Sequence, residues 1–371
     1  MISLKYTFSS DPSGYGSAAR NFVASLFTAG INITTEPIKQ TVENTDYGME
    51  GAICSKLKDR NIPYKIKIIH LTPDSIPMYQ EKGIYTISHL FWETDRLPKE
   101  WIQPLNSCDE IWTASPQMTE MIKRSGVSTL CSTFPQPIWT DQSEDTSPPF
   151  LLPFAKDFTF YSIFQWIDRK NPRALLRAYW KAFEGNDKVT LLLKTYRINY
   201  AESEFNLIKR DVEKWRKELD LKHYPKVYMT RKLLTQNQMI KLHKMGDCYV
   251  TSTSGEGWNR PIQEAMMLGK PVISADNGGI TDLLLKSQYF QVPSTPVNAT
   301  EVSTIPWYTR DMLWKEIDED KLAEQMLYVH NQYDKVKEVA KKTQDYVVSE
   351  FSYQTVGKKM YNRLLEIYKT L

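Results

Sequence analysis

The sequence predicts an α/β protein with two doubly wound parallel-sheet domains that face a central cleft. Strand-like and helix-like segments alternate along the whole chain, which is the pattern of parallel sheets covered by helices. The length of 371 residues is long for one core and fits two domains of ordinary size. Residues 141–153 break the alternation with acidic, Ser and Pro residues, so we take them as the linker between two Rossmann-like domains.

The N-terminal domain is expected over residues 1–150. Residues 2–8 alternate like a strand and lead into the loop SSDPSGYGS. A helix should follow, because Ala19, Phe22, Val23 and Leu26 recur at helical spacing before Gly30. Further strands are expected at residues 65–71, 84–93 and 110–115.

The C-terminal domain is expected over residues 151–348. Its strands are predicted at residues 158–164, 189–194, 226–230, 248–253 and 271–275, with helices in the intervals between them. Residues 293–312 have the composition of a loop. Two helical stretches, at residues 320–348 and 354–369, close the chain.

The bulk composition excludes several classes of protein. Hydrophobic residues make up 41% and charged residues 25% of the chain, as in soluble globular proteins. The net charge of +3 is nearly neutral, so we expect no nucleic-acid partner. The start, MISLKYTF, lacks the apolar core of a signal peptide, and no apolar run is long enough to span a membrane. The four scattered cysteines are expected to be reduced thiols in a cytoplasmic protein.

The most informative segment is residues 254–273, SGEGWNRPIQEAMMLGKPVI. It follows a predicted strand, and Pro261 suits the first turn of a helix that Gly269 would end. The glycine-bearing turn presents free backbone N–H groups at a positive helix end, which is a site for phosphate. Glu256 and Glu264 offer carboxylates that accept hydrogen bonds from paired sugar hydroxyls. Phosphate and hydroxyl recognition in one turn indicate a nucleotide sugar.

Three cations are placed to stabilise a departing diphosphate without a divalent metal. Arg169 and Lys170 follow the strand at residues 158–164 and precede a helix that opens with Pro172. Lys194 stands at the end of the strand at residues 189–194. The alternative for all three is ordinary surface charge.

Two glycine turns lie at predicted strand ends. Residues 13–17, SGYGS, place Gly14 and Gly16 where backbone could approach a diphosphate from the N-terminal domain, although such pairs also mark ordinary turns. Residues 275–282, ADNGGITD, form a second turn beside the main motif and should open another helix.

Several other polar residues have two interpretations. His70, His89 and Glu93 lie near strand ends of the N-terminal domain and are candidates to face an acceptor, or structural groups. The acidic run at residues 318–320 is a metal-binding motif or, as we prefer, the first turn of a helix. Residues 56–67 hold five cations and one acid. They form a solvated face or contact anionic lipid headgroups, which would place the protein peripherally at the inner membrane surface.

On these residues the chain resembles the retaining glycosyltransferases of the GT-B fold, in the large family numbered 4. Residues 255–279 match that family's signature of a glutamate, seven residues, a second glutamate and a Gly-Lys-Pro-Val run. The segments WETDRLPKEW, DEIWTAS and DRKNP also resemble segments found in members of that family. The resemblance covers nearly the whole chain.

The resemblance implies a role for each matching position. Glu264 would bind the ribose hydroxyls, and Glu256 would hold hydroxyls of the donor sugar. Lys170 would neutralise the diphosphate, and Gly16 would contribute backbone from the N-terminal domain. Backbone N–H groups near sugar and phosphate would come from Gly257, Trp258 and Asn259, and base recognition from the loop with Arg231 and Leu233. A last helix within residues 349–371 would cross back onto the N-terminal domain.

The resemblance also implies a reaction. In similar enzymes no protein nucleophile is needed, because the departing phosphate oxygen takes the acceptor proton on the same face. A nucleoside diphosphate sugar would be the substrate, and neither a metal nor another cofactor would be required. UDP-glucose is the first expected donor and GDP-mannose the second. The acceptor would be a saccharide or a lipid-linked saccharide in polysaccharide or glycoconjugate synthesis.

Two departures from the family pattern leave alternatives open. The family commonly has an arginine where this chain has Gln165, so Arg169 supplies the second cation or the leaving group is stabilised differently. The third residue of the turn is usually glycine but is Asn259 here, followed by Arg260, which leaves the donor sugar open. A catalytically weak protein that binds a nucleotide sugar or a partner on this scaffold is the alternative function. A dehydrogenase is disfavoured, because the third glycine of its phosphate-binding motif is Ala19.

Overall fold

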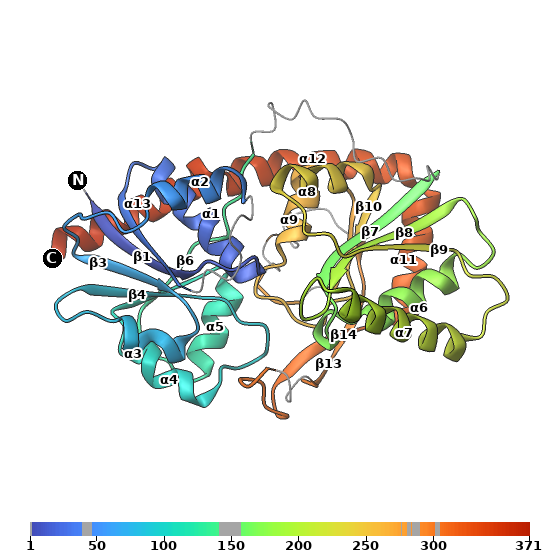
Figure 1. The fold of residues 1–371 in the computed structure, drawn as a ribbon, viewed down its shortest axis with the longest axis horizontal. Helices are drawn as coiled ribbons and strands as arrows, with labels where there is room; N and C mark the ends of the chain where they lie inside the picture. Colours follow the sequence, from blue (N-terminus) through green and yellow to red (C-terminus); the bar gives the residue numbers. More distant parts are fainter. Residues whose placement is uncertain are drawn as a thin grey trace.

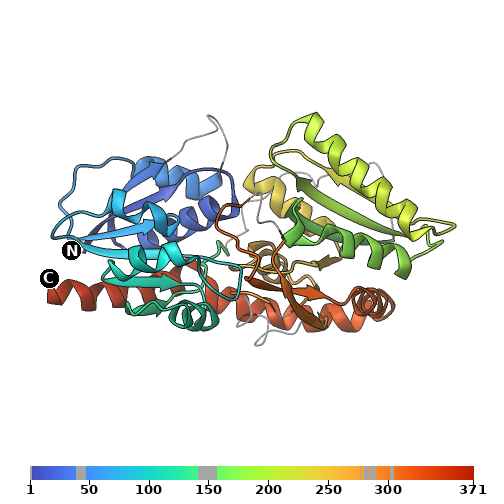
Figure 2. The ribbon, with the colours of Figure 1, turned by 90° about the horizontal axis from the view of Figure 1, so that it is seen from below.

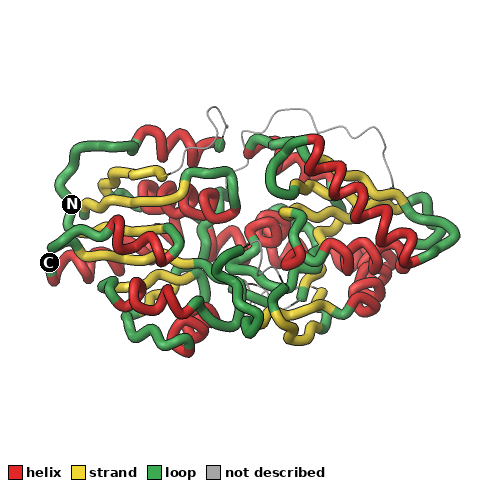
Figure 3. Tube along the Cα trace, turned by 60° about the horizontal axis from the view of Figure 1, so that its bottom comes forward, coloured by secondary structure: helices red, strands yellow, loops and turns green. Residues whose placement is uncertain are grey.

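The computed structural model describes residues 2–38, 47–140, 157–275, 277–279, 283, 290–300 and 305–371. Figure 1 shows two α/β domains side by side. Each contains a six-stranded parallel sheet, in the orders β2-β1-β3-β4-β5-β6 and β12-β11-β10-β7-β8-β9. Helices flank the strands in both domains (Figure 3). The predicted fold class, two Rossmann-like domains, is confirmed.

The N-terminal domain is built from short βα units. Its strands are β1 (Ser3–Ser9), β2 (Asn32–Ile38), β3 (Ile66–His70), β4 (Tyr85–Leu90), β5 (Glu110–Thr113) and β6 (Cys131–Thr133). Its helices are α1 (Gly14–Thr28), α2 (Gly48–Lys56), the 3₁₀ turn Pro73–Ser75, α3 (Ile76–Tyr79), α4 (Lys99–Asn106) and α5 (Pro116–Arg124).

The C-terminal domain repeats the same alternation. Its sheet holds β7 (Phe158–Gln165), β8 (Val189–Tyr196), β9 (Lys226–Thr230), β10 (Cys248–Val250), β11 (Val272–Ser274) and β12 (Phe290–Gln291). The helices between these strands are the 3₁₀ turn Asp168–Lys170, α6 (Pro172–Ala182), α7 (Glu202–Leu219), α8 (Gln236–Met245) and α9 (Arg260–Met267).

Local sequence explains where these elements lie. All residues of β3 and all but the last of β8 are buried, as expected for parallel strands with both faces covered. The helices begin at side chains that accept hydrogen bonds from free amides. Ser13 caps α1, Asn171 caps α6, and Thr235 forms a capping box at α8.

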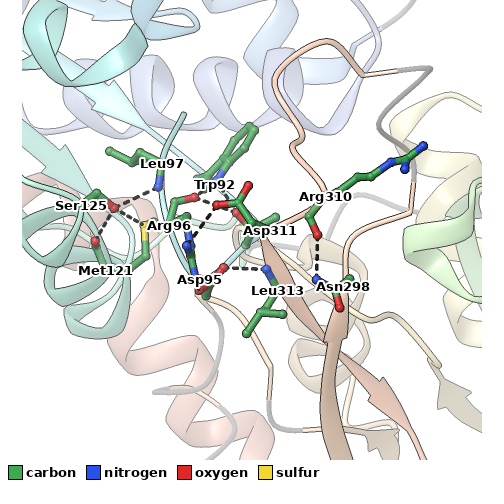
Figure 4. A network of polar contacts seen from close by, with 11 residues as sticks. Trp92, Asp95, Arg96, Leu97, Met121, Ser125, Asn298, Arg310, Asp311 and Leu313 are labelled. Carbon is green, nitrogen blue, oxygen red and sulfur yellow. Dashed lines mark hydrogen bonds and ion pairs between the residues drawn. The ribbon is translucent and has the colours of Figure 1, made fainter. Parts of the chain in front are cut away.

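An antiparallel hairpin of the C-terminal domain, β13 (Ser294–Asn298) with β14 (Leu313–Ile317), touches the N-terminal domain. The expectation of a loop at residues 293–312 is wrong for β13, because its pairing partner lies across a long connection that local pattern does not reveal. The amide of Asp95 donates to the carbonyl of Leu313 over 2.9 Å, and its carboxylate accepts from the Leu313 amide over 2.6 Å (Figure 4). The hairpin thus tethers the two domains.

The chain closes with α11 (Glu319–Asn331), α12 (Tyr333–Phe351) and α13 (Tyr353–Thr370). The stretch predicted as one helix is two, because the backbone leaves the helical region at Gln332. Figure 2 shows these helices running beneath both domains. The Ser25 hydroxyl of α1 donates to the Tyr353 carbonyl over 2.8 Å. The implied crossing of the last helix onto the N-terminal domain is confirmed.

Two sequence predictions fall outside the described residues. The predicted linker at residues 141–153 is one of them. The glycine turn at residues 275–282 is described only at residues 275 and 277–279, and the helix expected after it is described only at Leu283.

Candidate active site

A cleft between the two domains gathers most of the predicted site residues. Its cavity measures about 460 Å³, a volume typical of small-molecule sites. Its walls are the start of α1 in the N-terminal domain, the carboxyl ends of β7 and β8, and the start of α9. Ligands of parallel sheets bind at this end of the strands, so the cleft lies where the sequence predicts it.

The turn between β10 and α9 has an unusual backbone. Asn259, the residue before α9, has a φ of 65°, in the left-handed region that glycine favours and asparagine tolerates. A Cβ on Gly278 or Gly279 would overlap the carbonyl oxygen of Glu256 or Gly257. The Gly279 amide donates to the Glu256 carbonyl over 2.9 Å. The glycines at 278 and 279 therefore pack directly against the backbone of the turn that carries Glu256 and Gly257.

Glu256 is 6% exposed and lies at the centre of an ion cluster. Its Oε1 accepts hydrogen bonds from Lys170 Nζ over 2.6 Å and from Asn259 Nδ2 over 3.2 Å, and Arg169 lies 3.6 Å from Oε2. Burial alone would raise the pKa of Glu256, but Lys170 and Arg169 outweigh it and lower that pKa. Burial also lowers the pKa of Lys170, and Glu256 opposes this effect. The carboxylate is ionised and fixed in position.

Arg169 connects this cluster to the N-terminal domain. Its guanidinium donates to the Gly255 carbonyl over 2.6 Å and lies 3.4 Å from the carboxylate of Glu93. Glu93 follows β4 and lines the cleft. The structure therefore places Glu93, a candidate for the acceptor side, in direct contact with a cation of the C-terminal domain.

Glu264 is the second predicted carboxylate, and both of its oxygens have partners. Arg260 Nε donates to Oε1 over 2.6 Å, and His243 Nε2 lies 3.1 Å from Oε2. The Tyr161 hydroxyl lies 3.0 Å from His243 Nδ1 and can donate to it, which leaves Nε2–H to donate to Glu264. Burial would raise the pKa of Glu264, but Arg260 and His243 lower it to about 2. Arg260 also reaches the hydroxyl of Ser17 across the cleft.

Lys194 lines the cleft at the end of β8 and is 6% exposed. Its Nζ lies 5.2 Å and 5.0 Å from the ring centres of Tyr196 and Tyr200. Burial lowers its pKa to about 8. Among the described residues no carboxylate lies within ion-pair distance of this amine.

Gly16 does not line the cleft. Its amide donates to the Ser13 side chain over 3.2 Å, and a Cβ at this position would overlap the Asp11 carbonyl. The glycine is needed for close packing of the loop against the helix. Its neighbours Gly14 and Ser17 line the cleft instead.

The structure does not place His70 and His89 in the cleft, and the expectation that they face an acceptor is wrong. Both are completely buried, with their Nδ1 atoms 2.8 Å and 3.2 Å from the Tyr6 hydroxyl. Both rings stack on Phe91 at 5.5 Å, and Tyr15 covers His70. Burial lowers both pKa values, that of His89 to about 3. They are neutral core residues.

The predicted base loop is only partly directed at the cleft. Leu233 lines it and is 41% exposed. Arg231 does not, because its guanidinium donates to the Tyr200 carbonyl and pairs with Glu202. The arginine holds the loop in place rather than contacting the cavity.

The remaining residues of the motif contact the cleft mainly through backbone. Gly257 and Trp258 both line it, but the indole of Trp258 is buried and donates to Gln263 over 3.0 Å. Gln165 also lines the cleft, and its side-chain amide donates to the Arg197 carbonyl over 2.8 Å.

The acidic run at residues 318–320 begins a helix, as preferred. Asp318 caps α11, and Glu319 pairs with Arg177 at 3.0 Å. No cluster of three potential metal ligands occurs in the described ranges.

The basic segment at residues 56–67 is only partly a solvated face. Lys67 is 2% exposed and donates to the half-buried Glu81 over 2.6 Å, so it belongs to an ion pair rather than to a solvated face. Lys56, Lys58, Arg60 and Lys65 are exposed. No helix in the described part of the chain is apolar over a length that would cross a membrane, and all four cysteines are free.

Sequence reasoning missed Arg260 and Arg20, which line the cleft, and His243, which lies behind it and contacts Glu264. Arg260 precedes Glu264 by four positions on one helix, a spacing that could have indicated their contact. His243 and Arg20 gave no such signal, because tertiary packing alone brings them to the site. Arg20 is 4% exposed on α1, with its guanidinium 3.8 Å from the ring centre of Tyr47.

Comparisons with known proteins agree with this geometry. Residues 155–297 match the family model described as glycosyl transferases group 1. No curated protein matches the chain. Among solved structures, a sucrose-phosphate synthase from Thermosynechococcus elongatus has a TM-score of 0.72 at 13% identity, covering 100% of both chains.

Two other solved structures are similar over almost their full length. Anabaena HepE in complex with UDP and glucose has a TM-score of 0.68 at 13% identity, covering 99% of this chain and 100% of that one. The N-terminal domain of Candida albicans trehalose-6-phosphate phosphatase has a TM-score of 0.62 at 14% identity, covering 98% and 96%. At these identities the likeness shows the fold alone, which is the two-domain GT-B arrangement.

Proposed function

We propose that the protein is a retaining hexosyltransferase that moves a hexose from a nucleoside diphosphate sugar to a saccharide or lipid-linked saccharide. The observation that carries this proposal is the meeting of Glu256 and Glu264 with Lys170 and Arg169 in one interdomain cleft. The match of residues 155–297 to glycosyl transferases group 1 supports the class of reaction.

In the proposed reaction the bond from the sugar C1 to the diphosphate oxygen breaks, and a bond from C1 to the acceptor oxygen forms on the same face. The acceptor proton passes to the departing phosphate oxygen. Lys170, Arg169 and the free amides at the start of α9 face the charge that develops on the diphosphate. These groups do the work that a divalent metal does in other transferases, so the proposal needs no metal.

The two carboxylates bind hydroxyls rather than attack the sugar. Lys170 and Asn259 hold Glu256 in place from one side. Each oxygen of a carboxylate has two lone-pair directions, so Glu256 and Glu264 keep acceptor capacity beyond the protein partners they have. A donor sugar at Glu256 and a ribose at Glu264 would fill that capacity.

UDP-glucose is the first proposed donor and GDP-mannose the second. The presence of UDP and glucose in the structure of HepE supports the order, since that protein has the same fold. The proposed setting is cytoplasmic synthesis of a polysaccharide or glycoconjugate. For a lipid-linked acceptor, the exposed cations Lys56, Lys58 and Arg60 could contact anionic headgroups at the membrane surface.

The alternative is a catalytically weak protein that binds a nucleotide sugar or a partner. Gln165 favours it, because an uncharged amide tied to a backbone carbonyl stands where similar proteins have an arginine.

The deciding experiment incubates purified protein with UDP-glucose or GDP-mannose and a panel of saccharide acceptors, and measures free UDP or GDP. The proposal predicts release with one donor, a product of unchanged anomeric configuration by NMR, and loss of release in Glu256→Gln. Glu324→Gln, which changes an exposed ion pair, is the matched control. Nucleotide binding without release, unaffected by Glu256→Gln, would establish the alternative.

A further inference from the structure

Two buried cations of the cleft have no acidic partner among the residues that the structure describes. The other cations that line it, Arg169, Lys170 and Arg260, each lie within 4 Å of a glutamate oxygen. Arg20 and Lys194 have no such neighbour among the described residues, although they are only 4% and 6% exposed. A buried charge without a partner is costly, so this pair calls for an explanation.

Arg20 is held by neutral groups on the wall formed by the N-terminal domain. One guanidinium nitrogen donates to the carbonyls of Ser10 and Asp11 over 3.3 Å and 3.1 Å. The guanidinium carbon lies 3.8 Å from the ring centre of Tyr47. The nearby Asp11 carboxylate is occupied by the Ser9 hydroxyl and the Ser13 amide and lies beyond ion-pair distance. These contacts orient Arg20 without neutralising it.

Lys194 has an equivalent setting on the wall formed by the C-terminal domain. Tyr196 and Tyr200, whose ring centres are 4.7 Å apart, provide its nearest aromatic surfaces. Cation–π contacts of this kind stabilise an amine only partly. Burial consequently lowers the pKa of Lys194 to about 8, because the amine loses contact with water.

Arg20 and Lys194, with the groups around them, line the same cleft from different domains. Burial raises the pKa of Tyr200, and the nearby hydroxyls of Tyr196 and Tyr47 add to that effect. Asp11 similarly raises the pKa of Tyr196 beyond what burial does. Arg20 and Tyr47 belong to the N-terminal domain, and Lys194, Tyr196 and Tyr200 belong to the C-terminal domain. All of these residues except Asp11 line the same cavity.

Sheet order separates Lys194 from the Glu256 cluster. In the C-terminal sheet β7 lies between β10 and β8. Glu256 follows β10, whereas Lys194 lies near the end of β8, on the opposite side of β7. Lys194 therefore belongs to a second positive region within the cleft.

We infer that Arg20 and Lys194, one from each domain, form a subsite for a phosphate or carboxylate group, walled by Tyr47, Tyr196 and Tyr200. Under the proposed function, on which this assignment of the ligand rests, the group is the diphosphate of the donor or an acidic group on the acceptor. Because the two cations come from different domains, the anion also joins the domains. Both sources share the chemistry of an oxyanion that accepts charge-assisted hydrogen bonds.

The test measures binding by titration calorimetry to the wild type, Arg20→Gln and Lys194→Gln. Lys209→Gln and Arg216→Gln are matched controls, since Lys209 and Arg216 also lie over aromatic rings, of Phe205 and Tyr224, but are exposed on α7 outside the cleft. The first arm compares UDP with uridine, which lacks the phosphates. The second adds inorganic phosphate to protein saturated with UDP, and to the free protein.

We expect each cleft variant to lose about tenfold or more in affinity for one of these anions, with the controls unchanged. Loss for UDP but not for uridine identifies the donor diphosphate as the source. Loss for phosphate in the UDP complex, with UDP affinity kept, identifies an acidic acceptor. Unchanged affinities in both arms, or a wild type that binds neither anion, overturn the subsite.

Two features keep the test independent of folding and of turnover. Removal of an uncompensated buried charge should leave the melting temperature of unliganded Lys194→Gln unchanged or higher, so weaker binding in this variant reports the subsite itself. If Arg20→Gln does not fold, the Lys194→Gln data decide. Phosphate binding to the free protein needs no transferase activity, so the subsite can be found even if the proposed function fails. Equally, nucleotide release can be found even if the subsite fails.

Discussion

Nζ of Lys170 lies 2.6 Å from Oε1 of Glu256, and both side chains are largely buried between the domains. The lysine comes from the 3₁₀ turn after β7 and the glutamate from the turn after β10. Neighbouring strands of one parallel sheet therefore bring together two residues that are far apart in sequence. Each charge offsets the cost of burying the other. The pair therefore contributes both to the stability of the protein and to the arrangement of the site.

Removing either partner should destabilise the protein, and removing both should cost less than the sum. We expect Lys170→Met and Glu256→Gln each to lower the free energy of unfolding by about 3 kcal/mol, because a buried charge loses its main partner. Urea unfolding of the two variants and of the double variant measures the coupling. Strictly additive losses would show that the pair does not act as a unit. Nucleotide release should be lost in all three.

Glu264 should make stability depend on pH in the acid range. Its pKa is about 2 in the folded protein, against an ordinary value of 4.5. A lowered pKa stabilises the folded state fully above pH 4.5, and that contribution, about 3 kcal/mol, is lost as the pH falls towards 2. Urea unfolding between pH 6 and 3 should show a steeper loss for the wild type than for Glu264→Gln. Parallel curves would contradict the ion pair with Arg260.

Asn259 should tolerate glycine better than alanine. Its φ of 65° strains any side chain with a Cβ that cannot bond locally. We expect Asn259→Ala to be less stable than Asn259→Gly by about 1 kcal/mol in thermal unfolding. Both variants lose the hydrogen bond to Glu256, so their difference isolates the backbone. Equal stabilities would mean that the turn relaxes to another conformation.

The sequence predicted the features that rest on local pattern. The alternation of apolar runs predicted both sheets, since parallel strands buried on both faces are nearly continuous in apolar residues. The strand, turn and helix around Glu256 placed that residue correctly at a sheet edge, because Pro261 and Gly269 mark the helix ends. The position of Lys170 was predicted in the same way, because it follows a predicted strand.

Contacts that depend on packing between distant segments could not be predicted. His70 and His89 stand at strand ends as catalytic groups often do, yet Tyr6 and Phe91 enclose them in the core. Strand periodicity does not reveal which end residues are covered by a neighbouring loop. The role of Gly16 differed for the same reason, since the constraint on it is the nearby carbonyl of Asp11.

The β13–β14 hairpin should be released from the N-terminal domain by a change at Asp95. Asp95→Ala removes the acceptor of the Leu313 amide, and we expect a loss of about 1 kcal/mol. Faster hydrogen exchange at the Leu313 amide would localise the effect. Asp311→Ala is the control, because Asp311 is 67% exposed and contacts Arg96 only at the surface (Figure 4); it should change stability by less than about 0.5 kcal/mol. Equal losses of stability in the two variants would show that Asp95 does not tether the hairpin.

The contact between α1 and α13 should be sensitive to a single methyl group. Gly357 lies in the second turn of α13, inside the helix, where alanine would normally stabilise it by about 1 kcal/mol. Its Cβ would overlap the carbonyl of Ser25 in α1, however, and backbone cannot move aside easily. We therefore expect Gly357→Ala to lower the free energy of unfolding by about 2 kcal/mol, although its intrinsic effect has the opposite sign.

Gln354→Ala, at an exposed position of the same helix, is the matched control and should not destabilise the protein. The same experiment separates packing from chemistry, since neither position lines the cleft. Nucleotide affinity per folded molecule should stay unchanged in Gly357→Ala if α13 only fastens the domains together. A variant as stable as the wild type would contradict the close contact between the Gly357 backbone and the Ser25 carbonyl.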